Sequence, residues 1–349
     1  MTSHGARSGL LGAAAARLTY AVLQTRPPGG AAVWNRTNHR GEPVTLLEGP
    51  AVAIGAIAGA LAAGGSTRDR LALAVAGAGA AAFGAYDDIA GNGVSKGFRG
   101  HLGALREGEL TTGAVKIAGI GATGLAAALI AESAADASTD GSVSGSVAMA
   151  DTLINAALVA GGANLLNLFD LRPGRAAKVA LLAGGLLAPS RRGRSATAGP
   201  LAAAAALLPD DLGERSMLGD SGANALGAML GAAAAITLPR TARLGVLAFI
   251  VGLTAASEKV SFTKVIERTG PLHRLDMLGR RPAPAAGPAS ASPESANTES
   301  ASSELANTVL AAKGTPVSPD QPVSPDQPAG LDQAERTLAR RDRRSAGLR

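Results

Sequence analysis

Long uncharged runs of alanine, glycine and aliphatic residues alternate with short bursts of charge along most of this chain. A membrane-crossing helix needs about 20 apolar residues, or somewhat fewer where the bilayer thins. Nine segments fit that pattern: 10–23, 50–63, 71–86, 113–130, 149–165, 176–187, 200–208, 223–238 and 244–256. Each signal is weak alone, but a soluble domain could hardly bury the whole series. We predict an all-α, polytopic transmembrane helical bundle with about nine spans.

Composition supports this prediction and excludes other classes. Hydrophobic residues make up 46% of the chain, charged residues only 17%, and the 46 glycines would let helices approach closely in lipid. The absence of cysteine excludes disulfides, thiolate metal sites and a cysteine nucleophile. The net charge of +6 does not indicate nucleic-acid binding, because no basic patch is interleaved with stacking aromatic residues.

Basic residues in short loops predict the orientation, because cytoplasmic loops carry an excess of lysine and arginine. One set of alternate loops is rich in them: Arg26, Arg36, Arg40, Lys96, Arg99, Arg106, Arg172, Arg175, Lys178, Arg215, Lys259, Lys264, Arg268, Arg274, Arg280 and Arg281. We expect this set to be cytoplasmic in a cell (inner or plasma) membrane. Seven arginines oppose that assignment: Arg68, Arg70, Arg191, Arg192, Arg194, Arg240 and Arg243.

The chain changes character near residue 282. Proline, alanine, serine and glutamate dominate, and VSPDQP occurs at 317–322 and again at 323–328. Such a composition cannot bury a core. We predict a helical membrane domain over 1–281 and a disordered cytoplasmic tail over 282–349.

Four polar motifs lie at predicted span ends, all on the expected cytoplasmic face. The first is the pair Asp87 and Asp88, directly after segment 71–86. Adjacent carboxylates at a membrane boundary are unfavourable unless a cation or proton relieves them. Mg²⁺ uses hard oxygen ligands of this kind near a phosphate-bearing substrate. The alternative is a helix that happens to end in acidic residues.

The second motif is LGDSGAN at 218–224, which opens a predicted helix. Asp220 or Ser221 can cap that helix, and its N-terminus can also bind an anion. The third is a polar stripe, Asn164, Asn167 and Asp170, with a three-residue spacing that puts it on one helical face. Hydrogen bonding between helices is the structural alternative for that stripe.

The fourth motif, PLHRLD at 271–276, brings His273 beside Arg274, a pair that could grip phosphate. A lone exposed histidine is more often without a function. Independent accidents would scatter the four motifs over both faces, so their shared side favours a joint function.

At these residues the sequence resembles the polyprenyl-phosphate N-acetylhexosamine-1-phosphate transferase superfamily, which includes phospho-N-acetylmuramoyl-pentapeptide transferase. The similarity covers roughly residues 35–281, with the motifs in the expected order. The resemblance implies Mg²⁺-dependent transfer of a sugar-1-phosphate from a nucleotide sugar to polyprenyl phosphate, in cell-envelope glycan synthesis such as that of peptidoglycan. Expected partners are polyprenyl phosphate, a nucleotide sugar and membrane lipid, and a homodimer is kept open as the assembly.

The resemblance also implies roles for individual residues. Asp87 and Asp88 would be catalytic, with Asp87 deprotonating or orienting the lipid phosphate, and Asp220 and Asn167 would ligand Mg²⁺. Substrate-binding roles fall to Lys116, Asn164, Asp170, His273 and Arg274.

The chain departs from the family in three places. The segment LRPGR at 171–175 replaces a Gly-Leu-Asp-Gly-like segment that helps hold uracil, only one histidine remains in the late loop, and no apolar span follows it. A non-catalytic descendant that binds polyprenyl phosphate or scaffolds an envelope-synthesis complex is therefore the main alternative. A transporter is a third reading, but it predicts charges near the bilayer midplane, and here most charges sit at span ends.

Overall fold

The structure, a computed structural model, describes residues 3–91, 108, 111–132 and 145–282, all within one compact unit, Met1–Ala283. These residues form twelve helices and one short β-hairpin. The elements in chain order are α1 (Ser3–Thr25), α2 (Ala31–Trp34), β1 (Asn35–Thr37), β2 (Pro43–Thr45), α3 (Glu48–Leu61), α4 (Thr67–Ala90), α6 (Thr112–Glu132), α7 (Gly145–Phe169), α8 (Arg175–Leu187), α9 (Arg191–Leu212), α10 (Gly219–Thr237), α11 (Arg240–Ser257), α12 (Phe262–Arg268) and α13 (Gly270–Met277).

The predicted all-α fold is confirmed, and each of the nine apolar segments falls on one of the nine long helices. The number of membrane spans is not confirmed. Within the described residues, three helical stretches are long and apolar enough to cross a membrane: Thr112–Ala131, Gly145–Phe169 and Arg240–Ser257. Other long helices carry charge at their ends, such as Asp69 and Asp87 on α4, or are short, such as α8. Lys96, Arg99, Arg106 and all but the first residue of the predicted tail lie outside the described residues.

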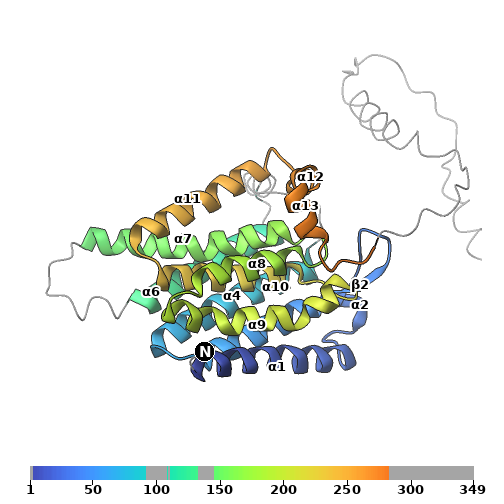
Figure 1. Ribbon diagram of the computed structural model, residues 1–349, viewed down its shortest axis with the longest axis horizontal. Helices are drawn as coiled ribbons and strands as arrows, with labels where there is room; N and C mark the ends of the chain where they lie inside the picture. The colour runs from blue at the N-terminus through green and yellow to red at the C-terminus, as the bar shows by residue number, and fades with distance from the viewer. Residues whose placement is uncertain (1–2, 92–107, 109–110, 133–144, 283–349) are drawn as a thin grey trace, which may run out of the picture. The chain divides into compact units, whose positions relative to one another are not determined.

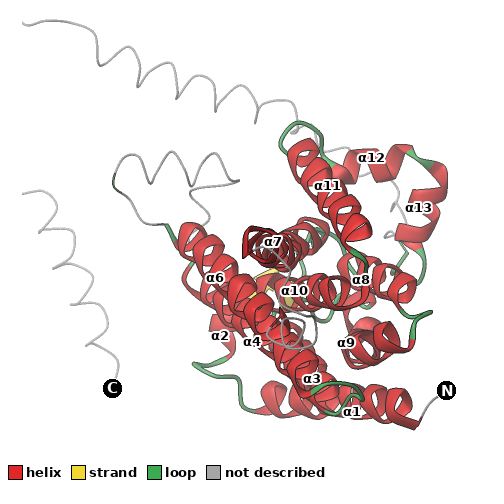
Figure 2. Ribbon diagram, turned by 90° about the vertical axis from the view of Figure 1, so that its left-hand side faces the viewer, coloured by secondary structure: helices red, strands yellow, loops and turns green. Residues whose placement is uncertain are grey.

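Consecutive long helices run in opposite directions, so the bundle has two ends (Figures 1 and 2). We call one the site end: it carries the C-termini of α1, α4, α7, α9 and α11, the N-termini of α3, α6, α8 and α10, and the hairpin. The opposite end carries the other termini of these helices. Serine caps fix several helix starts there and elsewhere, since Ser66, Ser190 and Ser261 each accept a backbone N–H from three residues further on.

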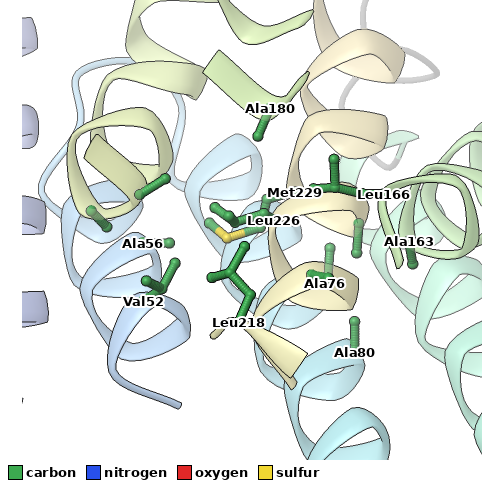
Figure 3. Close-up of a cluster of buried hydrophobic side chains, with 14 of the residues drawn as sticks. Val52, Ala56, Ala76, Ala80, Ala163, Leu166, Ala180, Leu218, Leu226 and Met229 are labelled. Atoms are coloured by element: carbon green, nitrogen blue, oxygen red, sulfur yellow. The ribbon is translucent and has the colours of Figure 1, made fainter. Parts of the chain in front are cut away.

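Helix α10 is the centre of the bundle and is buried along almost its whole length. It contacts α7, α4, α3, α9 and α8. Leu218, Leu226 and Met229 are fully buried, and the side chains around them are mostly alanine (Figure 3). The small side chains let the helices approach closely, which is the packing mode expected when van der Waals contact drives association.

Many other large apolar side chains point outward. Leu10 is 72% exposed, Leu186 82% and Phe249 63%. A water-soluble protein rarely leaves so many large apolar residues on its surface. A small-residue interior with an aliphatic exterior is consistent with a membrane protein, whose outer face contacts lipid.

The hairpin covers the site end. Its two strands pair antiparallel, with Arg36 opposite Val44. Trp34, which directly precedes the hairpin, is buried, and its indole N–H donates to the Pro28 carbonyl at 2.8 Å. Arg40 pairs with the buried Glu214 at 2.9 Å, which ties the hairpin to the segment before α10.

Gly227 gives the first testable prediction. A Cβ at this position would lie 2.2 Å from the Gly162 carbonyl oxygen, so Gly227→Ala should force α10 and α7 apart. Overpacking of this kind typically costs about 1–3 kcal/mol. We expect a lower melting temperature in detergent, followed by circular dichroism at 222 nm.

Gly252→Ala is the matched control, since a Cβ there meets nothing within 4 Å. It should leave the melting temperature unchanged or raise it slightly. Equal destabilisation by both variants would show that close α7–α10 contact is not what stabilises the bundle.

Candidate functional site

Three helices bring charged side chains together at the site end. Asp87 and Asp88 lie in the last turn of α4, which continues to Ala90 rather than stopping at residue 86 as the sequence analysis expected. Lys116 lies in the second turn of α6, and Asp220 in the first turn of α10. The three helices therefore contribute one polar cluster, defined here as Asp87, Asp88, Lys116 and Asp220.

Lys116 occupies the middle of this cluster. Its Nζ lies 2.6 Å from Asp87 Oδ2 and also contacts Asp220 Oδ2. The three side chains are only 16–24% exposed, so the charges are largely shielded from water. One ammonium thus relieves the repulsion between two carboxylates that converge from different helices.

Asp88 faces the N-terminus of α10 instead. Its carboxylate accepts the backbone N–H groups of Asp220 at 3.0 Å and Ser221 at 2.9 Å. These are two of the N–H groups that a helix start leaves without an intrahelical partner. The carboxylate therefore serves as a cap supplied by another helix, and its charge complements the positive end of the α10 dipole.

Burial raises the pKa of Asp88 to about 7, and the nearby negative charge of Asp220 adds to the shift. The two backbone N–H donors favour the ionised form and lower the pKa, but they do not cancel the desolvation. Asp88 lies two residues beyond the predicted segment 71–86, at the level where that segment would leave the bilayer. Its proton is therefore exchangeable near neutral pH.

Gly84 makes the contact between α4 and α10 geometrically feasible. A Cβ at this position would stand 2.3 Å from the Asp220 carbonyl oxygen, so any larger residue would push the start of α10 away. Gly219 contributes a positive φ of 56° at the turn into α10. Two glycines thus place the Asp220 carboxylate beside Asp87.

The structure divides the predicted Asn–Asn–Asp stripe. Asp170 follows α7, is buried, and accepts a hydrogen bond from the Gly219 backbone. Asn164 is exposed, and its amide donates to Thr254 of α11 at 3.4 Å. The single face expected for the stripe does not hold for Asn164, because three residues advance an α-helix by only about 300°, and the drift accumulates over two steps. Asn164 thus takes the structural role of a bond between helices.

Asn167 is half-buried one turn before Asp170. Among the described residues its side chain has no hydrogen-bond partner, whereas its carbonyl accepts the Asp170 N–H at 3.0 Å. The structure therefore brings Asp87, Asp88, Lys116 and Asp220 into contact and places Asp170 next to them. It shows no contact between them and Asn167.

The late motif is held at the site end by its last residue, Asp276, to which the sequence analysis gave no role. His273 and Arg274 on α13 are exposed, and neither side chain contacts the cluster. Asp276 is the buried residue of α13, and it pairs with Arg175 at 2.7 Å and Arg280 at 2.8 Å. A carboxylate between two guanidinium groups is a strong charge-assisted contact.

Sequence reasoning also missed a buried acidic group behind the cluster. Glu48 is fully buried and accepts the Ser216 hydroxyl at 2.6 Å, and Asp211 is 1% exposed. Burial, with the nearby charge of Asp211, raises the pKa of Glu48 well above its usual value, and burial raises that of Asp211 to about 7. The sequence analysis gave neither residue a role, although Asp211 directly follows Asp210 in an acidic pair like Asp87 and Asp88.

A cavity of about 220 Å³ borders this acidic group. Its walls include Asp170, Asp211, Glu214, His39 and Arg172. Within the described part of the chain, one carboxylate oxygen of Asp170 and one of Asp211 are buried without a hydrogen-bond partner. The cavity therefore offers two unsatisfied carboxyl oxygens to a ligand that donates hydrogen bonds.

The cluster fits Mg²⁺ in the type and spacing of its donors. Mg²⁺ is usually held by one or two carboxylates together with water and substrate phosphates. Asp87 and Asp220 already share one cation, the Lys116 ammonium, so they lie close enough to share another. Over the described residues no group of three or more histidine or acidic side chains surrounds a common point, so the protein would supply only part of the coordination shell.

A comparison with models of known protein families finds none that matches this chain, and a search of curated proteins finds no match either.

The raised pKa of Asp88 predicts how the stability of the protein changes with pH. Its pKa is higher in the folded state, about 7, than the ordinary value of 3.8, so the folded state binds the proton more tightly. The stability that this proton contributes is fully present below pH 4 and is lost as pH rises towards 7. The melting temperature of the wild type minus that of Asp88→Asn should therefore fall between pH 5 and 7 and level off above 7.

Glu267→Gln, which replaces an exposed carboxylate on α12, is the control and should show a constant difference over the same range. A pH-independent difference for Asp88→Asn as well would contradict the raised pKa.

Proposed function

We propose that this protein transfers a sugar-1-phosphate from a nucleotide sugar, of the UDP-N-acetylhexosamine type, to polyprenyl phosphate at the cytoplasmic face of the cell membrane. The observation that carries the proposal is the shared contact of Lys116 with Asp87 and Asp220. These residues are separated widely in sequence, and the resemblance to polyprenyl-phosphate sugar-1-phosphate transferases had already selected all three. Their position at one end of a helical bundle suits a lipid phosphate that stays at the bilayer boundary.

In the proposed reaction an oxygen of the lipid phosphate attacks the β-phosphorus of the donor. The bond from that phosphorus to the oxygen bridging the two phosphates breaks, which yields a polyprenyl-diphosphate-sugar and UMP. Such transfers depend mainly on positioning and on stabilising charge. The residues of this chain divide those two tasks among them.

Asp87 accepts the proton of the lipid phosphate or orients its attacking oxygen, and contact with the Lys116 ammonium holds its carboxylate in place. Lys116 steadies the phosphate oxygens as a point charge. Asp88 keeps the start of α10 fixed, and with it the Asp220 carboxylate. Mg²⁺, held by Asp220, would neutralise the charge of the diphosphate and of the leaving UMP.

The cavity beside Asp170 and Asp211 is the proposed place for the donor's base. Its unpartnered carboxyl oxygens can accept the N–H of a pyrimidine, and Arg172 on its wall belongs to the segment that departs from the family pattern. Because the Arg172 segment changes only one wall of a cavity that could still hold a base, we expect a different donor preference rather than loss of donor binding.

The test is UMP release by purified protein supplied with polyprenyl phosphate, UDP-N-acetylhexosamines and Mg²⁺. Asp87→Asn, Asp220→Asn and Lys116→Gln should each lower the rate at least about 100-fold, as loss of a charged group in contact with the reacting centre commonly does. Lys264→Gln is the matched control, because Lys264 is an exposed cation near the same end of the bundle and should leave the rate unchanged. Full activity in both aspartate variants would refute the assignment.

One observation favours a second candidate, a non-catalytic protein that binds polyprenyl phosphate. Lys116 already satisfies both carboxylates, so the cluster is charge-balanced without a metal ion. This candidate expects binding of polyprenyl phosphate that needs Lys116, with no UMP release from any UDP-sugar. The same preparation distinguishes the two candidates. If the wild type releases UMP faster than the Asp220→Asn variant does, the non-catalytic candidate is excluded.

A further inference from the structure

A second cavity in the described part of the protein lies at the opposite end of the bundle, between the N-termini of α4 and α9. Its volume is about 540 Å³. The two helix starts are joined across it, because Arg192 donates two hydrogen bonds to Asp69, at 2.9 and 3.0 Å, and Ser195 donates to the Gly64 carbonyl. The first turns of the two helices are therefore held together, and we call them the rim of the cavity.

The helix lengths place this cavity far from the polar cluster. Arg70 and Asp87 are seventeen residues apart on α4, which corresponds to about 26 Å along a helix. Ile236, on the cavity wall, and Asp220 are sixteen residues apart on α10, or about 24 Å. Both values approach the thickness of a bilayer's hydrocarbon core, about 30 Å. The cavity thus belongs at the other membrane interface, where lipid head groups lie.

The rim is strongly basic. Five arginines and one aspartate stand in the first turns of the two helices: Arg68, Asp69, Arg70, Arg191, Arg192 and Arg194. Helix N-termini already carry partial positive charge, so cations there are unfavourable unless an anion is present. These arginines are also among those that oppose the predicted orientation, since the non-cytoplasmic side normally has few of them. An anion bound at the rim would relieve the unfavourable charge at the two helix starts.

Arg70 supplies an independent sign of a missing partner. It donates to the Thr67 hydroxyl at 2.9 Å and to the Leu61 carbonyl at 3.4 Å, but its Nε is buried and has no hydrogen-bond partner among the described residues. A buried donor without a partner is rare in folded proteins. Arg70 lines the cavity, so a ligand there is a natural acceptor for it.

The inner wall of the cavity is apolar. Leu73 is 1% exposed, and Ala196 and Ile236 lie beside it on the wall. A basic rim over an apolar floor matches an amphiphile whose phosphate sits among the arginines. Bidentate guanidinium groups are well suited to phosphate oxygens.

We propose that the cavity between the N-termini of α4 and α9 is a binding site for a phosphate group, with Arg70, Arg191 and Arg192 as its cationic ligands. The site is separate from the polar cluster and does not depend on the proposed transferase activity. Its phosphate comes either from the head group of an anionic lipid or from free phosphate in solution.

The experiment titrates the full-length protein in detergent with dihexanoyl phosphatidic acid and, separately, with inorganic phosphate, and follows the melting temperature. The double variant Arg70→Gln/Arg191→Gln should need at least tenfold more ligand for the same stabilisation. Arg68→Gln/Arg194→Gln is the matched control: it removes the same charge from the same two helix turns, but neither residue lines the cavity. This control should stay within threefold of the wild type.

If phosphatidic acid saturates the effect at a tenfold lower concentration than inorganic phosphate, the proposal is supported and the bound phosphate is that of a lipid head group. If the two ligands saturate the effect at similar concentrations, the proposal is supported and the bound phosphate is free phosphate. No stabilisation of the wild type by either ligand, or equal loss in the two double variants, overturns the proposal. If the Arg70/Arg191 variant does not fold, Arg191→Gln alone repeats the test, because that side chain is exposed.

Lys116→Gln distinguishes the two ends of the bundle. It should retain the stabilisation, because Lys116 belongs to the polar cluster. Loss of stabilisation in Lys116→Gln, with retention in Arg70→Gln/Arg191→Gln, would place the bound phosphate at the site end and overturn the proposal, whatever the outcome of the UMP assay.

Discussion

The site depends on one contact, in which the first turn of α10 packs against the last turns of α4. Gly84 removes the side chain that would otherwise separate the two backbones, and Asp88 takes up the N–H groups of Asp220 and Ser221. Because α10 is also the buried centre of the bundle, the same helix connects this contact to most other helices. The geometry of Asp220 is therefore determined by the packing of the whole domain rather than by a flexible loop.

The bundle separates its charges along its length. Buried or half-buried carboxylates gather at the site end, where one lysine and a few arginines balance them, and arginines gather at the two helix starts of the opposite end. In a low-dielectric interior, unpaired charge is strongly unfavourable, so each end needs counter-charges that the protein supplies only in part. Both ends are thus suited to charged ligands, and the length of the helices between them keeps the two sites apart in space.

Sequence predicted the helices well because apolar runs are a local signal, and it placed Asp87, Lys116 and Asp220 in one site because their order matched a known pattern. It could not show that Asp88 caps α10 instead of facing a metal ion, since that depends on where Gly84 brings another helix. Glu48, Asp211 and Asp276 were given no role because their burial, which depends on the packing of several helices, is not visible in the sequence. Asn164 was misjudged because a three-residue spacing drifts around a helix.

Trp34 is the single tryptophan of the chain, and it is buried directly before the hairpin that covers the site end. Its indole is fixed by the Pro28 carbonyl, and α2, on which it stands, contacts α4. Any opening of this cover would transfer one indole from a dry to a wet environment. The native protein therefore contains a single tryptophan, placed directly before the hairpin, and its fluorescence reports on the hydration of this cover without labelling.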